Sequence, residues 1–187
     1  MMAPGRLEII CGCMFAGKTA RLIALLEAAG VRGHRAVAFK HRLDARYDPQ
    51  HLATHDGRRF DSLTAADPAA IEARCATADV IGIDEAQFFG RGLVPVCEHL
   101  RARGQRVIVA GIDHDAWGRP FPPLPQLKEI ADAVELMHAP CTVCGRPARF
   151  SQRVARLSDP DMVGGPGEYQ PRCETCFQPL PPPAPDY

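Results

Sequence analysis

The chain lacks a long hydrophobic run, and this absence excludes a membrane-spanning helix. No stretch of about 18 consecutive apolar residues occurs among its 187 residues. A short apolar segment near the N-terminus, residues 9–16, comes directly after Glu8 and is followed at once by Gly17 and Lys18, which is unlike a signal peptide. We therefore expect a cytoplasmic protein without membrane contact, in which cysteines are reduced.

The chain also lacks an excess of charge of either sign. Lysine plus arginine and aspartate plus glutamate each number 22, so the formal net charge at pH 7 is zero. Without a basic surplus, there is no electrostatic case for nucleic acid as the main partner. Only 6% of the residues are aromatic, but 46% are hydrophobic, and this length suffices for one α/β domain with a small appendage.

Short apolar runs alternate with segments of helical composition. We expect strands at residues 7–11, 35–39, 79–84, 106–112 and 133–137, and helices at residues 18–29, 68–76, 93–103 and 126–131. Apolar strands that alternate with helices are typical of a parallel sheet covered on both faces. The polar residues 40–66 show little periodicity, and we expect them to form a long loop or flap.

Residues 12–19, GCMFAGKT, fit the phosphate-binding pattern G-x-x-x-x-G-K-[ST] between a predicted strand and a predicted helix. The glycines let the backbone curl so that its N–H groups face phosphate oxygens, and the helix N-terminus adds its positive end. We expect Lys18 to reach the β- and γ-phosphates of ATP and Thr19 to supply a hydroxyl to Mg²⁺. The loop as a whole consists of Gly12, Cys13, Met14, Phe15, Ala16, Gly17, Lys18 and Thr19.

Two adjacent carboxylates, Asp84 and Glu85, stand at the end of the predicted strand 79–84. An acid at this place in a phosphate-loop protein holds Mg²⁺ directly or through water, and we assign Asp84 to that role. Glu85 has three open interpretations. It is a base that deprotonates a substrate hydroxyl, a base that activates water in an ATPase, or an exposed acid without a role.

Four cysteines near the C-terminus form two C-x-x-C pairs separated by 28 residues, namely Cys141, Cys144, Cys173 and Cys176. Two such pairs are typical of a tetrahedral, structural Zn²⁺ site, and disulfides or redox pairs are the alternatives. The remaining cysteines, Cys11, Cys13, Cys75 and Cys97, are expected to be small buried apolar residues.

The segment between the two cysteine pairs contains MVGGPGEY, residues 162–169. Its glycines allow the main chain to approach a ligand closely, and Tyr169 offers an aromatic face. These features favour a lid over a small molecule, and the alternative is a zinc ribbon that binds a protein or nucleic acid.

Composition divides the chain into three parts. We expect a phosphate-loop nucleotide-binding domain at residues 1–138, a zinc-binding domain at residues 139–177 and a disordered proline-rich tail at residues 178–187. A polyproline ligand for a partner protein is the alternative for the tail.

From residue 5 to about residue 177, the chain resembles the cytosolic-type (type II) thymidine kinases. The resemblance rests on motifs in the same order and spacing: GCMFAGKT, LDARY (43–47), THDG (54–57), IDEAQFF (83–89), RPF (119–121), ARFSQR (148–153), VGGPGEY (163–169) and the two C-x-x-C pairs. It implies a phosphate-loop core with a zinc-clamped lasso domain, assembled as a homotetramer. The implied reaction transfers the γ-phosphate of ATP to the 5′-hydroxyl of thymidine.

The resemblance also implies roles for individual residues. It makes Glu85 the general base and places Thr19 and Asp84 at Mg²⁺. Around the phosphates and the sugar it places Asp44 and Arg46, and it puts Gln87 in the nucleotide site. To the nucleoside pocket it assigns Met14, Phe89, Ala116, Trp117, Pro160, Asp161, Met162, Val163, Gly164 and Tyr169.

The chain departs from the family pattern at several positions. Cys13 and Ala16 replace the usual Pro and Ser, and Glu168 replaces a usual Lys. Ala116, followed by Trp117, stands where the family has an aromatic residue against the base, and losing one such contact costs about 1–3 kcal/mol. Either Trp117 replaces that contact or the pocket is altered. The alternatives to a thymidine kinase are a kinase for deoxyuridine or another nucleoside, and a phosphate-loop ATPase with a zinc-ribbon binding module.

Overall fold

The computed structural model describes residues 5–43, 51–54, 57–155 and 167–181. The helices are α1 (Lys18–Val31), α2 (Pro68–Arg74), α3 (Leu93–Ala102), α4 (Leu124–Ile130) and the 3₁₀ turn η1 (Ala86–Phe89). The strands are β1 (Arg6–Gly12), β2 (Ala36–His41), β3 (His51–Ala53), β4 (Arg59–Ala65), β5 (Val80–Ile83), β6 (Arg106–Gly111), β7 (Ala133–Met137), β8 (Ala139–Pro140), β9 (Pro147–Ala148), β10 (Phe150–Arg153) and β11 (Tyr169–Arg172). Among these described residues, none of the helices combines the length and apolar composition needed to cross a membrane.

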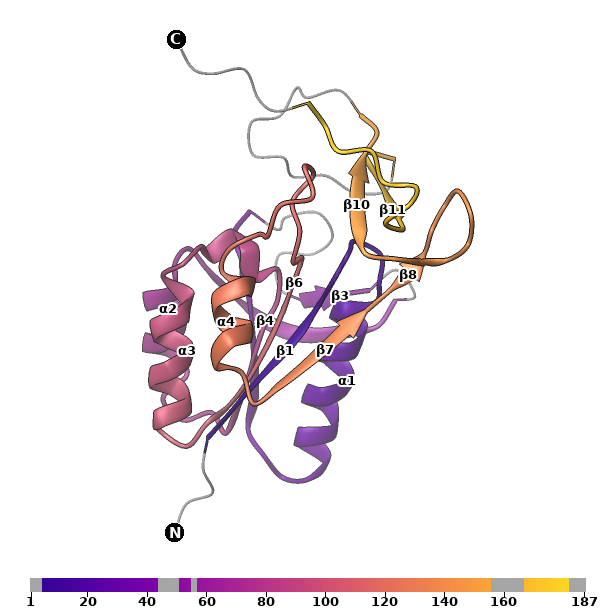
Figure 1. Ribbon diagram of the computed structural model, residues 1–187. Helices are drawn as coiled ribbons and strands as arrows, with labels where there is room; N and C mark the ends of the chain where they lie inside the picture. The colour runs from indigo at the N-terminus through magenta and orange to yellow at the C-terminus, as the bar shows by residue number, and fades with distance from the viewer. Residues whose placement is uncertain (1–4, 44–50, 55–56, 156–166, 182–187) are drawn as a thin grey trace.

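The described part of the chain forms a seven-stranded sheet in the order β3-β4-β2-β5-β6-β1-β7. Every neighbouring pair is parallel except β3 with β4. Helix α1 covers one face, and α2, α3 and α4 cover the other (Figure 1). The predicted α/β architecture is therefore confirmed, and the carboxyl ends of the parallel strands meet at one edge.

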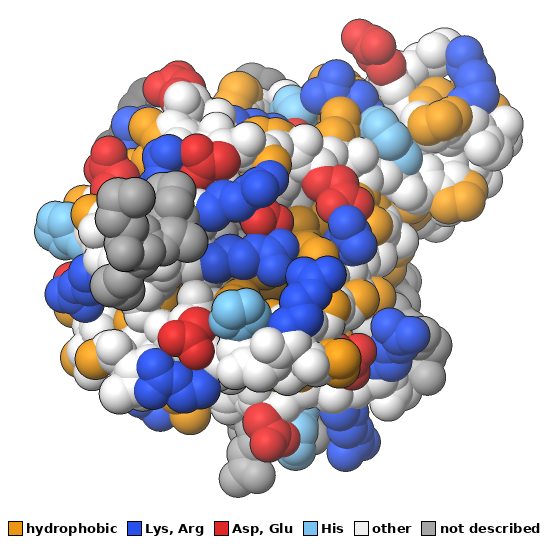
Figure 2. All heavy atoms as spheres, turned by 90° about the horizontal axis from the view of Figure 1, so that it is seen from below, with side chains coloured by type: hydrophobic (Ala, Val, Ile, Leu, Met, Phe, Trp, Pro, Cys, Tyr) orange, Lys and Arg blue, Asp and Glu red, His pale blue; other side chains and the backbone are white. Residues whose placement is uncertain are grey.

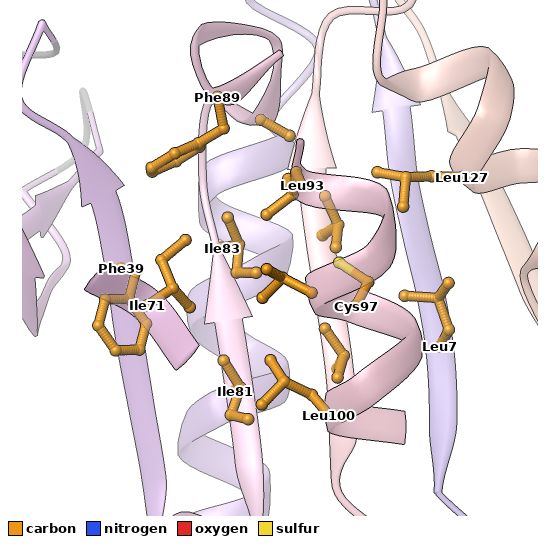
Figure 3. Packing of buried hydrophobic residues seen from close by; sticks show 14 of the residues in the cluster. Leu7, Phe39, Ile71, Ile81, Ile83, Phe89, Leu93, Cys97, Leu100 and Leu127 are labelled. Carbon is orange, nitrogen blue, oxygen red and sulfur yellow. The ribbon is translucent and has the colours of Figure 1, made fainter. Parts of the chain in front are cut away.

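Alternation along β1 explains how one strand supplies two cores. Leu7 and Ile9 point toward α3 and α4, whereas Ile10 packs with Leu22 and Leu26 of α1. The larger core lies between the sheet and α2, α3 and α4 (Figure 3). Burial on both faces is why these strands read as continuous apolar runs.

The prediction of a long loop at residues 40–66 is partly wrong. This region contains β3 and β4, and β4 pairs in parallel with β2 from Ser62 to Ala65. Because β4 lies near the edge of the sheet, six of its seven residues are partly buried or exposed, and only Ala65 is buried. Its sequence is correspondingly polar. The apolar pattern that marked the central strands is thus absent here.

Arginines gather at the amino ends of the strands, on the face seen from below in Figure 2. Most of them are paired with acids. Arg6 and Arg106 contact Glu8, and Arg35 contacts Asp79, at 2.8–3.2 Å. This pairing agrees with a chain of zero net charge.

A buried ion pair fixes the turn that follows β6. Asp113 accepts a hydrogen bond from Lys128 of α4 at 2.8 Å, and its side chain is 2% exposed. Burial alone would raise the pKa of Asp113, but the neighbouring His114 ring and the Lys128 ammonium outweigh burial and hold this pKa well below its usual range.

We expect Lys128→Met to lower the free energy of unfolding by about 1.5–3 kcal/mol at neutral pH, because it leaves a buried carboxylate without its cation. Since the pKa of Asp113 is lower in the folded protein, this stabilisation is complete above the unfolded pKa and is lost as the pH falls below about 4. Urea unfolding at pH 7 and at pH 3 measures both effects. Glu129→Gln, an exposed change on the same helix, is the control, and an equal loss at both pH values would contradict the assignment.

Candidate active site

The phosphate loop connects β1 to α1 at the carboxyl edge of the sheet. Gly12, Phe15 and Gly17 have positive φ angles of 139°, 63° and 81°. Gly12 also lies so close to β7 that an added Cβ would be 2.1 Å from the carbonyl oxygen of Met137. Left-handed residues next to right-handed ones form the backbone nests that bind anions, so the loop fits a phosphate group.

Two polar side chains of the loop are already engaged. Lys18 is buried and donates to the carbonyl of Cys13 at 2.7 Å, so its ammonium lies over the loop. The hydroxyl of Thr19 donates to the Asp84 carboxylate at 2.8 Å. A hydroxyl beside a buried carboxylate is the oxygen donor set that suits Mg²⁺ in phosphate-loop proteins.

Glu85 sits at the end of β5 in a left-handed conformation, with φ 50° and ψ 47°. A non-glycine residue in this region is strained, and such strain is common at functional sites. The side-chain amide of Gln87 donates to the Glu85 carboxylate, and its oxygen accepts from the N–H of Ile112 at 3.1 Å. Gln87 thus joins Glu85 to the chain that leaves β6.

A small apolar cluster lies beside the phosphate loop. It consists of Met14, Ala116 and Tyr169, with Ile112, Trp117 and Leu180 packed against it, and we call it the Met14 cluster. The Tyr169 hydroxyl accepts a hydrogen bond from the buried Arg153 at 3.0 Å, and the Arg153 guanidinium lies 5.3 Å from the Tyr169 ring centre. Arg153 therefore holds the tyrosine in place.

The four predicted zinc ligands come together. Their sulfur atoms lie within 4.8 Å of one another, and the Cys144 sulfur is 3.5 Å from that of Cys173 and 3.6 Å from that of Cys176. Tetrahedral zinc with Zn–S bonds of about 2.3 Å requires sulfur separations of about 3.8 Å. A disulfide would require about 2.0 Å, so the geometry fits zinc and excludes disulfides between these sulfurs.

Residues of β8 and β9 and of the cysteine-bearing turns pack on the phosphate loop, and β10 lies next to it (Figure 1). The hydroxyl of Ser151 in β10 accepts from the N–H of Met14 at 2.9 Å. Cys13 is buried against Ala148, Cys141 and Cys173, and its thiol donates to the carbonyl of Ala148 at 3.4 Å. Cys13 and Ala16, which depart from the family pattern, both belong to this contact.

His41, at the end of β2, is neutral. Burial lowers its pKa. Its Nε2 donates to the carbonyl of Ala66 and its Nδ1 accepts from the N–H of Leu43, a pattern that only the neutral ring can make. The His41 ring also packs edge-on against the Phe89 ring, and the two ring centres are 4.8 Å apart.

Several predicted pocket residues are not part of the Met14 cluster. Phe89 packs in the larger core instead. Trp117 is partly buried and packs against the Met14 cluster, whereas Ala116 is buried within it. The indole N–H of Trp117 donates to the carbonyl of Pro181 at 2.9 Å. The other predicted residues, Asp44, Arg46, Pro160, Asp161, Met162, Val163 and Gly164, lie outside the described residues.

Sequence reasoning did not single out Ser151, Gln152 or Arg153, three consecutive buried polar residues in β10. Ser151 contacts the phosphate loop and Arg153 contacts Tyr169, while Gln152 accepts from the N–H of Gln178 at 2.7 Å. Their only signal was membership in the ARFSQR motif, because polar residues give no hydrophobic periodicity.

Comparison with known proteins identifies the relationship. The family profile described as thymidine kinase matches residues 5–177. The chain belongs to the thymidine kinase family. A thymidine kinase from Rhodothermus sp. (strain ITI 518) is 44% identical over 94% of this chain and 82% of its own length, and one from Bacteroides thetaiotaomicron is 43% identical over 92% and 87%. The flagellar accessory protein FlaH from Methanocaldococcus jannaschii matches with a TM-score of 0.50 and 13% identity over 72% of each chain, a likeness of fold alone.

In this member of the family, we expect purified protein to carry close to one zinc ion per chain and Cys176→Ser to lose it, because the variant removes one of four ligands. Metal analysis and release of zinc to a colorimetric chelator measure this. Cys75→Ser changes a buried thiol outside the cluster and should keep its zinc. Full zinc content in Cys176→Ser would contradict the site.

Proposed function

We propose that the protein is a thymidine kinase that transfers the γ-phosphate of ATP to the 5′-hydroxyl of thymidine. One observation carries the proposal. The backbone of Met14 belongs to the phosphate loop, and its side chain belongs to the apolar cluster with Ala116 and Tyr169. A site for phosphates and an apolar surface suited to a base are therefore adjacent.

The phosphate loop would bind the triphosphate of ATP. Its N–H groups and Lys18 neutralise charge on the phosphates, and releasing Lys18 from the Cys13 carbonyl frees its ammonium for this role. Thr19 and Asp84 would hold Mg²⁺, which would neutralise negative charge on the phosphates. Asp44 and Arg46 are proposed to contact the phosphates and the sugar.

Glu85 is the proposed general base. It follows Asp84 directly, so it stands beside the proposed metal site, and Gln87 fixes its carboxylate. A base positioned in this way accepts the proton of the 5′-hydroxyl as that oxygen attacks the γ-phosphate. Gln87, which the family resemblance places in the nucleotide site, acts in this proposal as a positioning residue.

The lasso domain would close the site over the nucleoside. The four cysteines would hold zinc at the foot of this domain, Ser151 accepts a hydrogen bond from the phosphate loop, and Arg153 holds Tyr169 within the Met14 cluster. Residues 160–164 are proposed to read the base edge with their backbone. A closed lid excludes water, which favours transfer to a nucleoside over hydrolysis.

The first test measures ADP formation against a panel of nucleosides. We expect thymidine to be the best acceptor, with little ADP released when no nucleoside is present. ADP release at the same rate without nucleoside would instead support an ATPase. A preference for deoxyuridine or another nucleoside would keep the kinase reaction and change the substrate.

The second test is Glu85→Gln, which keeps the shape of the side chain and removes the base. We expect kcat for thymidine to fall by about 10²–10⁴-fold, with little change in thymidine or ATP binding measured by calorimetry. Glu98→Gln, an exposed change on α3, is the control. Activity within a few-fold of the parent protein would disprove the assignment of the base.

We also propose a homotetramer in the cytoplasm, and no role for nucleic acid. Val134 and Leu136 of the edge strand β7 support self-association, because they point to the same face of the sheet and are 48% and 40% exposed. The grouping of Cys141, Cys144, Cys173 and Cys176 in a metal-type cluster, rather than in disulfides, supports a reducing compartment.

Leu136→Lys should weaken the assembly, because it places a charge in the proposed contact. Analytical ultracentrifugation should find the mass of four 20.4 kDa chains for the parent protein and a smaller species for the variant. Val31→Lys, an exposed change at the end of α1, is the control. A monomeric parent protein would rule out the tetramer.

A further inference from the structure

Residues 177–181, which we name the tail segment, are anchored at three points. The ring of Phe177 stacks on Phe150 of β10, with ring centres 4.5 Å apart. The N–H of Gln178 donates to the buried side-chain oxygen of Gln152 at 2.7 Å. The carbonyl of Pro181 accepts from the indole N–H of Trp117 at 2.9 Å. The first residues of the proline-rich tail therefore follow a defined path.

The turn that carries Trp117 is itself well fixed. One carboxylate oxygen of Asp115 accepts from the N–H groups of Trp117 and Arg119, each at 2.9 Å. The guanidinium of Arg119 lies 4.7 Å from the centre of the Trp117 ring and contacts the second oxygen of Asp115 at 2.8 Å. The indole is thus held between Arg119 and the tail segment, and it presents its N–H to a single carbonyl.

Anchoring at Gln178 and Pro181 brings Leu180 onto the Met14 cluster. Leu180 is half-buried there, packed with Met14, Ala116 and Tyr169. Ala116 contributes only a methyl group to the interior of the cluster, and the neighbouring Trp117 packs against the cluster while its indole N–H points to Pro181. Leu180, 64 positions after Ala116, adds apolar surface to the cluster. The hydrogen bond from Trp117 to Pro181 holds the segment that carries Leu180 in this place.

We propose that the tail segment forms a wall of the nucleoside pocket, with Leu180 as its contact surface and Trp117 as its anchor. Leu180 thereby supplies apolar surface beside Ala116, where the methyl group alone leaves the cluster small. This inference rests on the proposed function, because it assigns the Met14 cluster to the base of the nucleoside. It makes residues 180 and 117 determinants of nucleoside affinity rather than of the chemical step.

Leu180→Ala tests the wall. We expect the KM for thymidine to rise about 5- to 20-fold, with kcat and the KM for ATP changed less than about twofold, because the lost contact is with the nucleoside alone. Leu180→Met should restore most of the affinity. A chain that ends after Pro181 should behave as the parent protein, whereas a chain that ends after Gln178 should resemble Leu180→Ala.

Trp117 is the only tryptophan in the chain, so its fluorescence reports on this wall without labelling. Thymidine binding should change its emission, and Leu180→Ala should shift the emission of the free protein to longer wavelength because the indole becomes more exposed to water. Zinc content should be the same in every variant, which excludes loss of the lasso domain as the cause.

An unchanged KM for thymidine in Leu180→Ala would overturn the wall. A lower KM would also overturn it, since the segment would then obstruct the pocket. These outcomes are distinct from failure of the proposed function. If the parent protein phosphorylates no nucleoside, the kinase proposal fails, whereas a parent protein that phosphorylates thymidine with no effect of Leu180→Ala refutes the wall alone.

Discussion

The hydrogen bond from the N–H of Met14 to Ser151 is the contact on which the site depends, because it joins the phosphate loop to the lasso domain. Phosphoryl transfer requires the triphosphate and the acceptor to be aligned closely, and small displacements are costly. Cys13 and Ala16 add apolar packing to the same contact. The group of four cysteines lies close to this contact, in the turns next to β8, β9 and β11, and Ser151 and Tyr169 belong to the paired strands β10 and β11.

The central fold was predictable because a strand that is buried on both faces has an almost continuously apolar sequence. The runs that became β1, β5 and β6 are apolar almost throughout, and the glycines and lysine of the phosphate loop are constrained by its backbone and charge. The two cysteine pairs were equally clear, since four thiols at that spacing have few uses. Local chemistry sufficed for each of these features.

Features that depend on residues far away in the sequence have no recognisable local sequence pattern. Strand β4 is half exposed and polar, so only its pairing with β2 reveals it. The buried polar residues of β10 have meaning only through Met14, Tyr169 and Gln178. The exchange of an aromatic residue for Ala116 was visible in the sequence, but the contact of Leu180 with the same cluster required the path of the chain.

The separation of Ser151 and Met14 by 137 positions has a consequence for biosynthesis. The phosphate loop leaves the ribosome long before Ser151 and the four clustered cysteines, Cys141, Cys144, Cys173 and Cys176. Strand β1 likewise pairs with β6 and β7, which begin 100 and 127 residues after it, so its pairing cannot form until they have been made. The phosphate loop is therefore made well before the strands that complete its surroundings, and a nascent chain that stops before β10 would expose the loop without its partner.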